Sequence, residues 1–191
     1  DFITPKSAVS KLFRNAALEL ARTQPFARKL VNSGRLSVPS FLVHSALNTP
    51  DADAFAGNMV PGAPMDDAPV RVAGQDAWLL DQLGNRFVLM VFVEGAQGLD
   101  PAQRTSLQAL AQAPIPVQLL TVGRGGDVDD PQGLVARRYD AQPGTAYLVR
   151  PDQHVAARWR GVHLAAVQAA LARATGQGLA AAVARHEAVA A

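Results

Sequence analysis

The sequence of 191 residues contains no cysteine. Disulfide bonds, thiolate metal sites, iron–sulfur clusters, CxxC redox chemistry and cysteine nucleophiles are therefore all excluded. Long hydrophobic runs are also missing, because the longest one, Phe87 to Val93, is far shorter than the roughly 20 residues needed to cross a bilayer. We therefore expect no membrane partner.

The chain has no strong excess of charge of either sign, with 18 Lys and Arg against 16 Asp and Glu. The charges are unevenly distributed, with a net +5 over residues 1–50, −7 over 51–135 and +4 over 136–191, which indicates a segmented chain. All three lysines lie before residue 30 at helical positions, not beside exposed aromatic side chains. We therefore expect no nucleic-acid partner.

Motifs for catalysis and cofactor binding are absent as well. The sequence holds no GxGxxG loop and no GxSxG elbow. Its four histidines show no metal-ligand spacing, and the acidic stretch at 127–130 lacks the later glycine and glutamate of a calcium loop, so we predict a solvated loop there. We assign no catalytic, cofactor-binding or metal-binding residue to this chain.

The first residues, Asp1-Phe2-Ile3, include neither an initiator methionine nor the basic and apolar regions of a signal peptide. We therefore expect a piece of a longer, cytoplasmic protein. Thr4-Pro5 predicts the start of a helix, with Thr as N-cap and Pro at the first helical position. Apolar residues then recur every three or four positions to about Arg22, which places four large ones on a single face: Val9, Leu12, Phe13 and Leu20. An apolar stripe is a liability when exposed, so we expect it to pack against another domain or a second copy.

Periodicity disappears between Ser37 and Pro69, where five prolines occur. A loop of this length is unusual inside one compact domain. We therefore place a domain boundary within it, near residue 50, with a helical appendage at 1–50 and the main domain at 51–191.

The main domain alternates between strand and helix patterns. Strands are expected at 70–72, 86–93, 116–122, 146–149 and 154–159, and helical segments at 76–83, 100–112, 134–139, 162–175 and 179–189. A strand–helix–strand unit implies a parallel crossover, and the last two strands form a hairpin. This order predicts an α/β, thioredoxin-like mixed sheet flanked by helices. A redox member of that fold carries two cysteines after the first core strand, where this chain has Glu94 to Leu99.

The hairpin at 146–159 and the position directly after it carry three arginines, Arg150, Arg158 and Arg160. Arg158 and Arg160 are two residues apart on a strand, so they should point to the same face, and Arg150 can reach Asp152 or the acidic middle segment. Two interpretations remain open. The arginines either form an ion-pair network that fixes the hairpin turn, or they join the apolar stripe as contacts to another domain or subunit.

Residues Tyr147 to Trp159, YLVRPDQHVAARW, resemble the tail motif of the class A FAD-dependent aromatic hydroxylases, of the phenol hydroxylase and 3-(3-hydroxyphenyl)propionate hydroxylase type. Residues 60–64 (VPGAP) resemble the entry to that family's thioredoxin-like tail domain, and residues 80–89 resemble its buried strand. Residues 2–5 through 35–37 resemble the helix that ends its flavin domain. Gln153 departs from the family's usual glycine.

The resemblance implies that residues 1–50 are the helical tail of a flavin domain with the start of a linker, and that 51–191 are a thioredoxin-like C-terminal domain. It implies FAD and NAD(P)H as cofactors of a parent enzyme that hydroxylates a phenolic substrate with O₂. This fragment itself would hold no cofactor and would be a redox-silent structural or dimerisation domain, with the parent's flavin domain or a second copy as partner. The alternative is a stand-alone thioredoxin-like module that binds a peptide or small ligand without redox chemistry.

Overall fold

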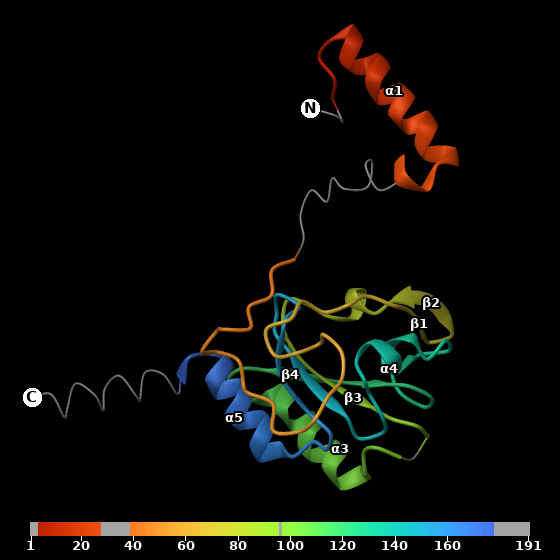
Figure 1. The fold of residues 1–191 in the computed structure, drawn as a ribbon. Coiled ribbons are helices and arrows are strands. Elements are labelled where there is room, and N and C mark those ends of the chain that lie inside the picture. The colour runs from red at the N-terminus through yellow and green to blue at the C-terminus, as the bar shows by residue number, and fades with distance from the viewer. Residues whose placement is uncertain (1–3, 28–38, 96, 178–191) are drawn as a thin grey trace, which may run out of the picture. The chain divides into compact units, whose positions relative to one another are not determined.

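A computed structural model describes residues 4–27, 39–95 and 97–177. The chain divides into two compact units between Pro39 and Ser40. The first unit contains a long helix, and the second contains a sheet with its flanking helices (Figure 1). The helix expected at 179–189 and most of the N-terminal family motif, residues 2, 3 and 35–37, lie outside the described residues.

The helix of the first unit, α1, spans Ala8–Thr23. The prediction that Thr4 caps it is wrong, because Ser7 does so: its Oγ accepts a hydrogen bond from the backbone N–H of Ser10 at 3.1 Å. Pro5 therefore precedes the helix instead of opening it. A side-chain oxygen at this position satisfies one of the N–H groups that the first turn leaves without a partner.

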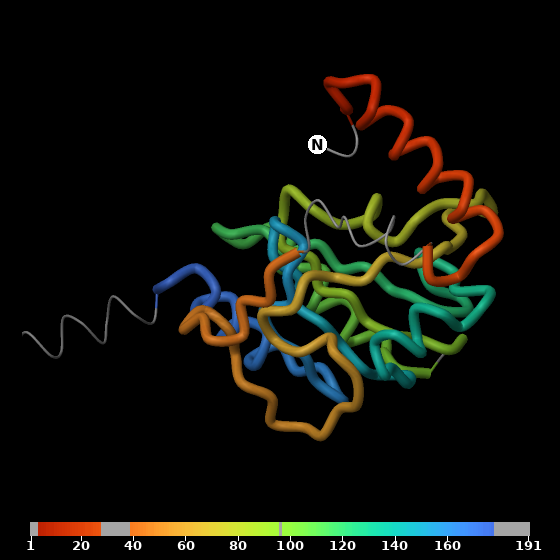
Figure 2. Tube along the Cα trace, turned by 45° about the horizontal axis from the view of Figure 1, so that its top comes forward, coloured from red at the N-terminus to blue at the C-terminus, as the bar shows by residue number. Residues whose placement is uncertain are grey.

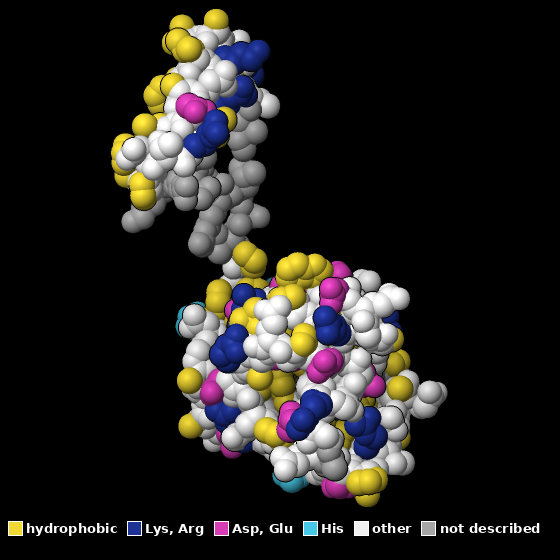
Figure 3. Space-filling view, turned by 90° about the vertical axis from the view of Figure 1, so that its right-hand side faces the viewer, with side chains coloured by type: hydrophobic (Ala, Val, Ile, Leu, Met, Phe, Trp, Pro, Cys, Tyr) yellow, Lys and Arg dark blue, Asp and Glu magenta, His cyan; other side chains and the backbone are white. Residues whose placement is uncertain are grey.

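No residue of α1 is buried. The predicted apolar stripe lies on this helix, and its members are exposed: Val9 at 78%, Leu12 at 72%, Phe13 at 69% and Leu20 at 45%. Figure 3 shows hydrophobic side chains gathered along one side of this helix and basic ones along another. The helix is therefore amphipathic, with an apolar face available for packing.

The second unit is built on one mixed sheet of seven strands in the order β2-β1-β5-β4-β3-β6-β7. The strands are β1 Pro69–Val72, β2 Gln75–Trp78, β3 Phe87–Phe92, β4 Val117–Val122, β5 Val128–Asp129, β6 Ala146–Val149 and β7 Val155–Trp159. β3 and β4 are parallel, whereas β3–β6 and β6–β7 are antiparallel. The expected parallel crossover and C-terminal hairpin are both confirmed.

Helices cover both faces of this sheet (Figure 1). α3 (Pro101–Gln108) continues into a 3₁₀ turn, Ala109–Gln112, and packs on one face with α5 (Leu164–Ala174); α4 (Leu134–Arg138) packs on the other. Asp100 caps α3 as expected, accepting from the N–H of Gln103 at 2.9 Å. The fold is therefore α/β and thioredoxin-like, as the order of elements predicted.

All six residues of β3 are buried, which explains its continuous apolar sequence. Successive side chains of a strand point to opposite faces. Val88, Met90 and Phe92 belong to the core under α4, and Phe87, Leu89 and Val91 belong to the core under α3 and α5. A strand covered on both faces has no polar position.

The helix expected at 76–83 is a wrong prediction. β2 occupies Gln75–Trp78 and pairs with β1, and only a short 3₁₀ turn, Leu80–Gln82, follows. The reason is the two-residue turn Ala73-Gly74, in which both φ angles are positive, 50° and 80°. Such a turn matches the twist of a tight hairpin and returns the chain as a strand.

Among the described residues, no helix combines the length and apolar character that crossing a membrane requires.

Candidate functional site

Residues 40–68, which we call the strap, contain no helix or strand but bind the outer edge of β7. The N–H of Thr49 donates to the carbonyl of Ala156 at 2.9 Å, the N–H of Gly62 donates to Val155 at 2.7 Å, and the N–H of Val155 donates to Ala63 at 2.9 Å. Figure 2 shows the strap in orange and yellow beside the blue C-terminal part of the chain. The strap therefore covers an edge that would otherwise offer unpaired backbone groups.

Arg158 fastens the strap from the middle of β7. Its side chain is 3% exposed, and its Nε and Nη2 donate to the two carboxylate oxygens of Asp51 at 3.0 and 2.6 Å. Its guanidinium carbon also lies 4.3 Å from the centre of the Phe55 ring. Burial lowers the pKa of Arg158, but Asp51 and Tyr147 together raise it by more, so the net shift is upward and the guanidinium stays charged. A two-pronged pair of this kind fixes geometry as well as charge.

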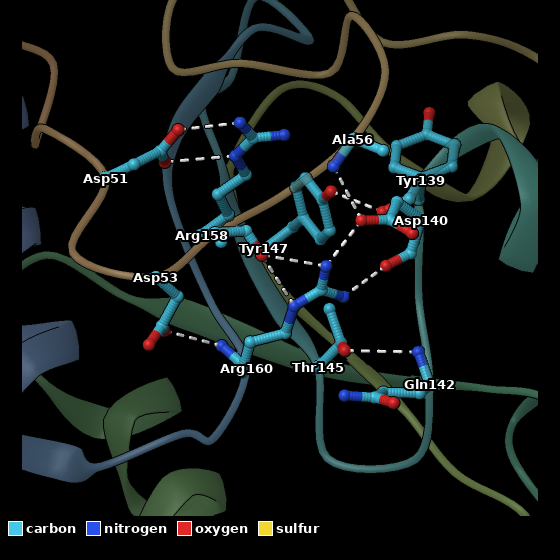
Figure 4. Close-up of polar contacts among 11 residues, drawn as sticks. Asp51, Asp53, Ala56, Tyr139, Asp140, Gln142, Thr145, Tyr147, Arg158 and Arg160 are labelled. Atoms are coloured by element: carbon cyan, nitrogen blue, oxygen red, sulfur yellow. Dashed lines mark hydrogen bonds and ion pairs between the residues drawn. The ribbon is translucent and has the colours of Figure 1, made fainter.

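Arg160 forms the second fastening, two residues further along the same face (Figure 4). Its guanidinium carbon lies 3.8 Å from the centre of the Phe55 ring, so both arginines contact one aromatic side chain of the strap. Its Nη2 donates to the carbonyl of Ala54 at 2.9 Å, and its backbone N–H donates to the carboxylate of Asp53 at 2.9 Å. It also binds the carboxylate and carbonyl oxygens of Asp140. Arg158 and Arg160 with their partners, which we call the arginine cluster, thus connect the strap, β7 and the segment after α4.

Asp140, which follows α4, contacts both the strap and Arg160. Its carboxylate accepts a hydrogen bond from the N–H of Ala56 at 2.7 Å as well as the bond from Arg160. Both bonds lower the pKa of Asp140 below its usual value, and the bond from Ala56 has the larger effect. Its φ of 46° is uncommon for a residue other than glycine, and these contacts hold it there.

Replacing Asp140 by asparagine should lower the melting temperature at neutral pH, and the difference from wild type should shrink in acid. Because the folded-state pKa is depressed, the carboxylate contributes stability above its unfolded pKa of about 3.9 and loses that contribution as the pH falls through the folded value. Thermal unfolding should be followed from ~pH 7 down to the lowest pH at which both proteins fold. Asp76→Asn, at an exposed pair with Arg71, is the control. An Asp140→Asn difference that stays constant across this range would contradict the assignment.

Two buried tyrosines lie beneath the cluster (Figure 4). The hydroxyl of Tyr147 donates to the carbonyl of Tyr139 at 2.6 Å, and the hydroxyl of Tyr139 donates to the carbonyl of Asp66 at 2.6 Å. Their rings meet edge to face at 5.3 Å between centroids. Burial raises the pKa of both hydroxyls. Both hydroxyls therefore stay protonated and act as hydrogen-bond donors, Tyr139 to the strap and Tyr147 to Tyr139.

The structure brings the hairpin arginines to different places. Arg150 donates to Asp152 at 2.6 Å within the turn, as expected. Arg158 and Arg160 share a face, also as expected, but their partners lie in the strap and after α4. The sequence interpretation missed four residues of this site: Asp51, Asp53, Phe55 and Asp140. The negative charge of the middle segment was a signal for Asp51 and Asp53 alone, and no pattern pointed to Phe55 or Asp140. A role of the arginines and of the α1 stripe in contacts to another domain stays a prediction.

The loop after β3 is where a redox member of this fold carries its thiols. Here Glu94 forms an exposed ion pair with Arg124, and the N–H of Gly95 donates to the carbonyl of Arg124 at 2.7 Å. A cleft of about 550 Å³ opens beside this loop at the carboxyl ends of β3 and β4. Ligands in open α/β sheets bind at such an edge.

The glycine loop at 123–126, the best glycine cluster for holding a phosphate, does not fit the pyrophosphate of FAD. It leads into β5 and not into the N-terminus of a helix, which phosphate binding requires. The N–H groups of Gly123 and Gly126 already donate to the carbonyls of Val128 and Gly123, at 2.8 and 2.9 Å. The carboxylate of Asp127, which accepts from the N–H and the hydroxyl of Thr121 at 2.9 and 2.7 Å, adds negative charge.

Metal ligands are not gathered anywhere in the described part of the chain, where no three His, Asp or Glu side chains are placed to hold an ion. The acidic stretch at 127–130 serves the backbone instead. The carboxylate of Asp130 accepts from the N–H groups of Leu134 and Ala136, both at 2.9 Å, and so holds the first turn of α4. The loop is solvated as predicted, with Asp127 and Asp129 exposed and Asp130 partly exposed, and two of its carboxylates also bind the backbone or a hydroxyl within the chain.

Comparison with protein families gives a match over residues 58–178 to the C-terminal region of aromatic-ring hydroxylases. A curated relative, 4-methyl-5-nitrocatechol 5-monooxygenase of Burkholderia sp, is 32% identical over 105 residues, which are 55% of this chain and 18% of that protein. This chain therefore spans less than a fifth of the length of that relative.

Two solved structures share the fold. The flavin-dependent monooxygenase PieE, in complex with FAD and substrate, superimposes with a TM-score of 0.62 at 24% identity, over 90% of this chain and 31% of that one. Aklavinone-11 hydroxylase, in complex with FAD and aklavinone, superimposes with a TM-score of 0.55 at 20% identity, over 84% and 33%. At these identities the likeness concerns the fold alone.

Proposed function

The chain belongs to the family of aromatic-ring hydroxylase C-terminal domains, and from this membership we propose that it is the tail of an FAD-dependent monooxygenase that hydroxylates a phenolic ring with NAD(P)H and O₂. The monooxygenase name of the curated relative, and the FAD in both structural neighbours, support this assignment. The flavin chemistry belongs to the remainder of such an enzyme, because the glycine loop of this chain does not accommodate a pyrophosphate.

Within that enzyme the tail serves packing and dimerisation without redox chemistry of its own. The observation that carries this proposal is a thioredoxin-like sheet in a chain without a single cysteine. Dithiol exchange needs two thiols, and the loop that follows β3 has none. A fold can lose its usual chemistry and be kept for its surface.

The apolar stripe of α1 is the surface through which we propose that the packing occurs. Leu12 and Phe13 are about 70% exposed, at 72% and 69%. Apolar area gains roughly 25 cal/mol per Å² on removal from water, so a partner surface would stabilise this helix. The flavin domain of the parent or a second copy is that partner.

This function predicts that the purified chain does not retain FAD. After incubation with excess FAD and gel filtration, the protein fraction should show no flavin absorbance, because the described residues offer no phosphate cradle. Retention of one FAD per chain would overturn the assignment. A gene whose reading frame extends far upstream of Asp1 and contains a GxGxxG loop would exclude the stand-alone binding module.

Sedimentation of the same sample separates the packing role from the flavin assignment. If α1 mediates association, Phe13→Asp should shift the chain toward monomer at concentrations where the wild type self-associates. Asn15→Asp, on the opposite side of the helix, also adds one negative charge and should leave association unchanged. Equal sedimentation of wild type and Phe13→Asp as dimers would place the dimer contact elsewhere.

A further inference from the structure

The cleft of about 550 Å³ beside β3 and β4 has the size and position of a small-molecule site. Four segments form its walls: the ends of β3 and β4, the β5–α4 junction, and the loop between α4 and β6. Its accessible apolar lining consists of Pro131, Ala136, Ala141 and Pro143. A ligand seated here would therefore bury an apolar body against the domain.

Most charged groups around the cleft are already partnered within the chain. Glu94 and Arg124 pair with each other at the rim, so their charges largely cancel. Asp130 accepts two backbone N–H groups of α4. These three side chains shape the cleft but have little left to offer a ligand.

Two polar side chains on separate walls have no hydrogen bond among the described residues: the carboxylate of Asp129 on β5 and the side-chain amide of Gln142 before β6. The strand register places Arg71 opposite Asp129, but the Nε of Arg71 donates to Asp76 at 3.0 Å. Among the described residues Asp129 therefore has no ion pair, and together with Asp130, whose partners are uncharged N–H groups, it gives the cleft a negative charge.

We propose that this cleft binds a small organic cation with a flat apolar body, such as an aromatic amidine or amine. The cationic group donates hydrogen bonds to the carboxylate of Asp129, the body lies against the apolar lining at Ala136 and Ala141, and the amide of Gln142 contacts the polar edge of the ligand. This site is separate from the arginine cluster and does not depend on the flavin assignment.

Other classes of ligand fit less well. An extended peptide would pair with backbone groups beside Pro143, but the N–H of Gln142 donates to the Thr145 hydroxyl at 3.1 Å and its carbonyl accepts from the N–H of Thr145 at 2.9 Å. An anion would meet Asp129 and Asp130, with its one nearby cation, Arg124, already bound to Glu94. Charge and backbone pairing thus favour a cation over both.

Titrating the full 191-residue chain with benzamidine, and separately with the neutral isostere benzamide, tests the proposal. In amide NMR spectra, benzamidine should cause saturable shifts that map to the ends of β3 and β4 and to α4, and benzamide should bind at least tenfold more weakly. Asp129→Asn should weaken benzamidine binding about tenfold, which corresponds to ~1.4 kcal/mol. Asp76→Asn, which removes an exposed carboxylate outside the cleft, should leave binding unchanged.

Three results would overturn the proposal: no saturable shift with benzamidine, equal binding of benzamide, or undiminished binding by a folded Asp129→Asn protein. If Asp129→Asn does not fold, Gln142→Ala replaces it, because Gln142 is exposed and its side chain has no hydrogen bond among the described residues. A loss of affinity in Gln142→Ala with an unchanged melting temperature would support the site, and unchanged affinity would count against it.

Discussion

Replacing Asp51 by alanine is expected to lower the free energy of unfolding by about 3–5 kcal/mol. The substitution leaves the guanidinium of Arg158, whose side chain is 3% exposed, inside the protein without its counter-charge and without two hydrogen bonds. A buried charge that loses its partner costs more than the pair contributed, because the solvation it gave up is not recovered. Urea unfolding at neutral pH, analysed by linear extrapolation, measures the loss.

The same chain supplies a matched control. Asp76 binds Arg71 at 3.0 Å, but the two side chains are 88% and 52% exposed. Asp76→Ala should therefore cost only about 0–1 kcal/mol. Similar losses at Asp51 and Asp76 would show that Arg158 reaches water in solution, and that the strap is not fastened as described.

Replacing Gly123 by alanine should destabilise the sheet by about 3 kcal/mol or more. Its φ is 118°, and a Cβ atom built there would lie 2.2 Å from the carbonyl oxygen of Val93. The backbone cannot easily shift, because the N–H of Val93 donates to Val122 at 2.9 Å and the N–H of Gly123 donates to Val128 at 2.8 Å. Both the strand ends and the cleft beside them would have to rearrange.

Two other glycines separate steric overlap from backbone strain in this experiment. Gly74 has a φ of 80° with nothing within 4 Å of a built Cβ, so Gly74→Ala carries the conformational penalty alone, about 1–2 kcal/mol. Gly161 also has open space and no positive φ, so Gly161→Ala should have little effect. A Gly123→Ala loss no larger than that of Gly74→Ala would mean that β3 and β4 yield at this end.

Elements with a continuous local pattern could be predicted from the sequence. β3 reads as an unbroken apolar run because alternate side chains enter two cores, and α3 reads as a helix because Asp100 caps it and Pro101 opens it. The C-terminal hairpin could also be predicted, because the four turn residues Arg150-Pro151-Asp152-Gln153 separate two apolar strands. In each case the information lies within a few neighbouring residues.

Elements set by one unusual backbone conformation could not be predicted. Alanine rarely adopts a positive φ, so the sequence gives no sign that Ala73 has a φ of 50°. The tight turn before β2 was therefore missed, and the apolar residues after it were interpreted as a helix. β5, with two residues, is too short to show a pattern and exists because Val128 fits between β1 and β4.

The arginine cluster shows a further limit of local reasoning. Asp51 and Arg158 are 107 residues apart, and the residues around Asp51 have no periodicity that would suggest a sheet partner. The charge of the middle segment indicated acidic partners for the hairpin but could not select among eleven carboxylates. Only the fold brings the chosen one to β7.

The distance in sequence between the strap and β7 also sets an order of events at the ribosome. At about 5–20 residues per second, the strap waits about 5–20 seconds after its own synthesis before Arg158 is made. During that time its apolar residues Met59 and Met65, which end up buried, have no sheet edge to bind. When β7 emerges, however, the strap that will cover it is already present. The strap is thus synthesised before β7, the last strand of the sheet, so the outer edge of β7 can be covered as soon as that strand forms.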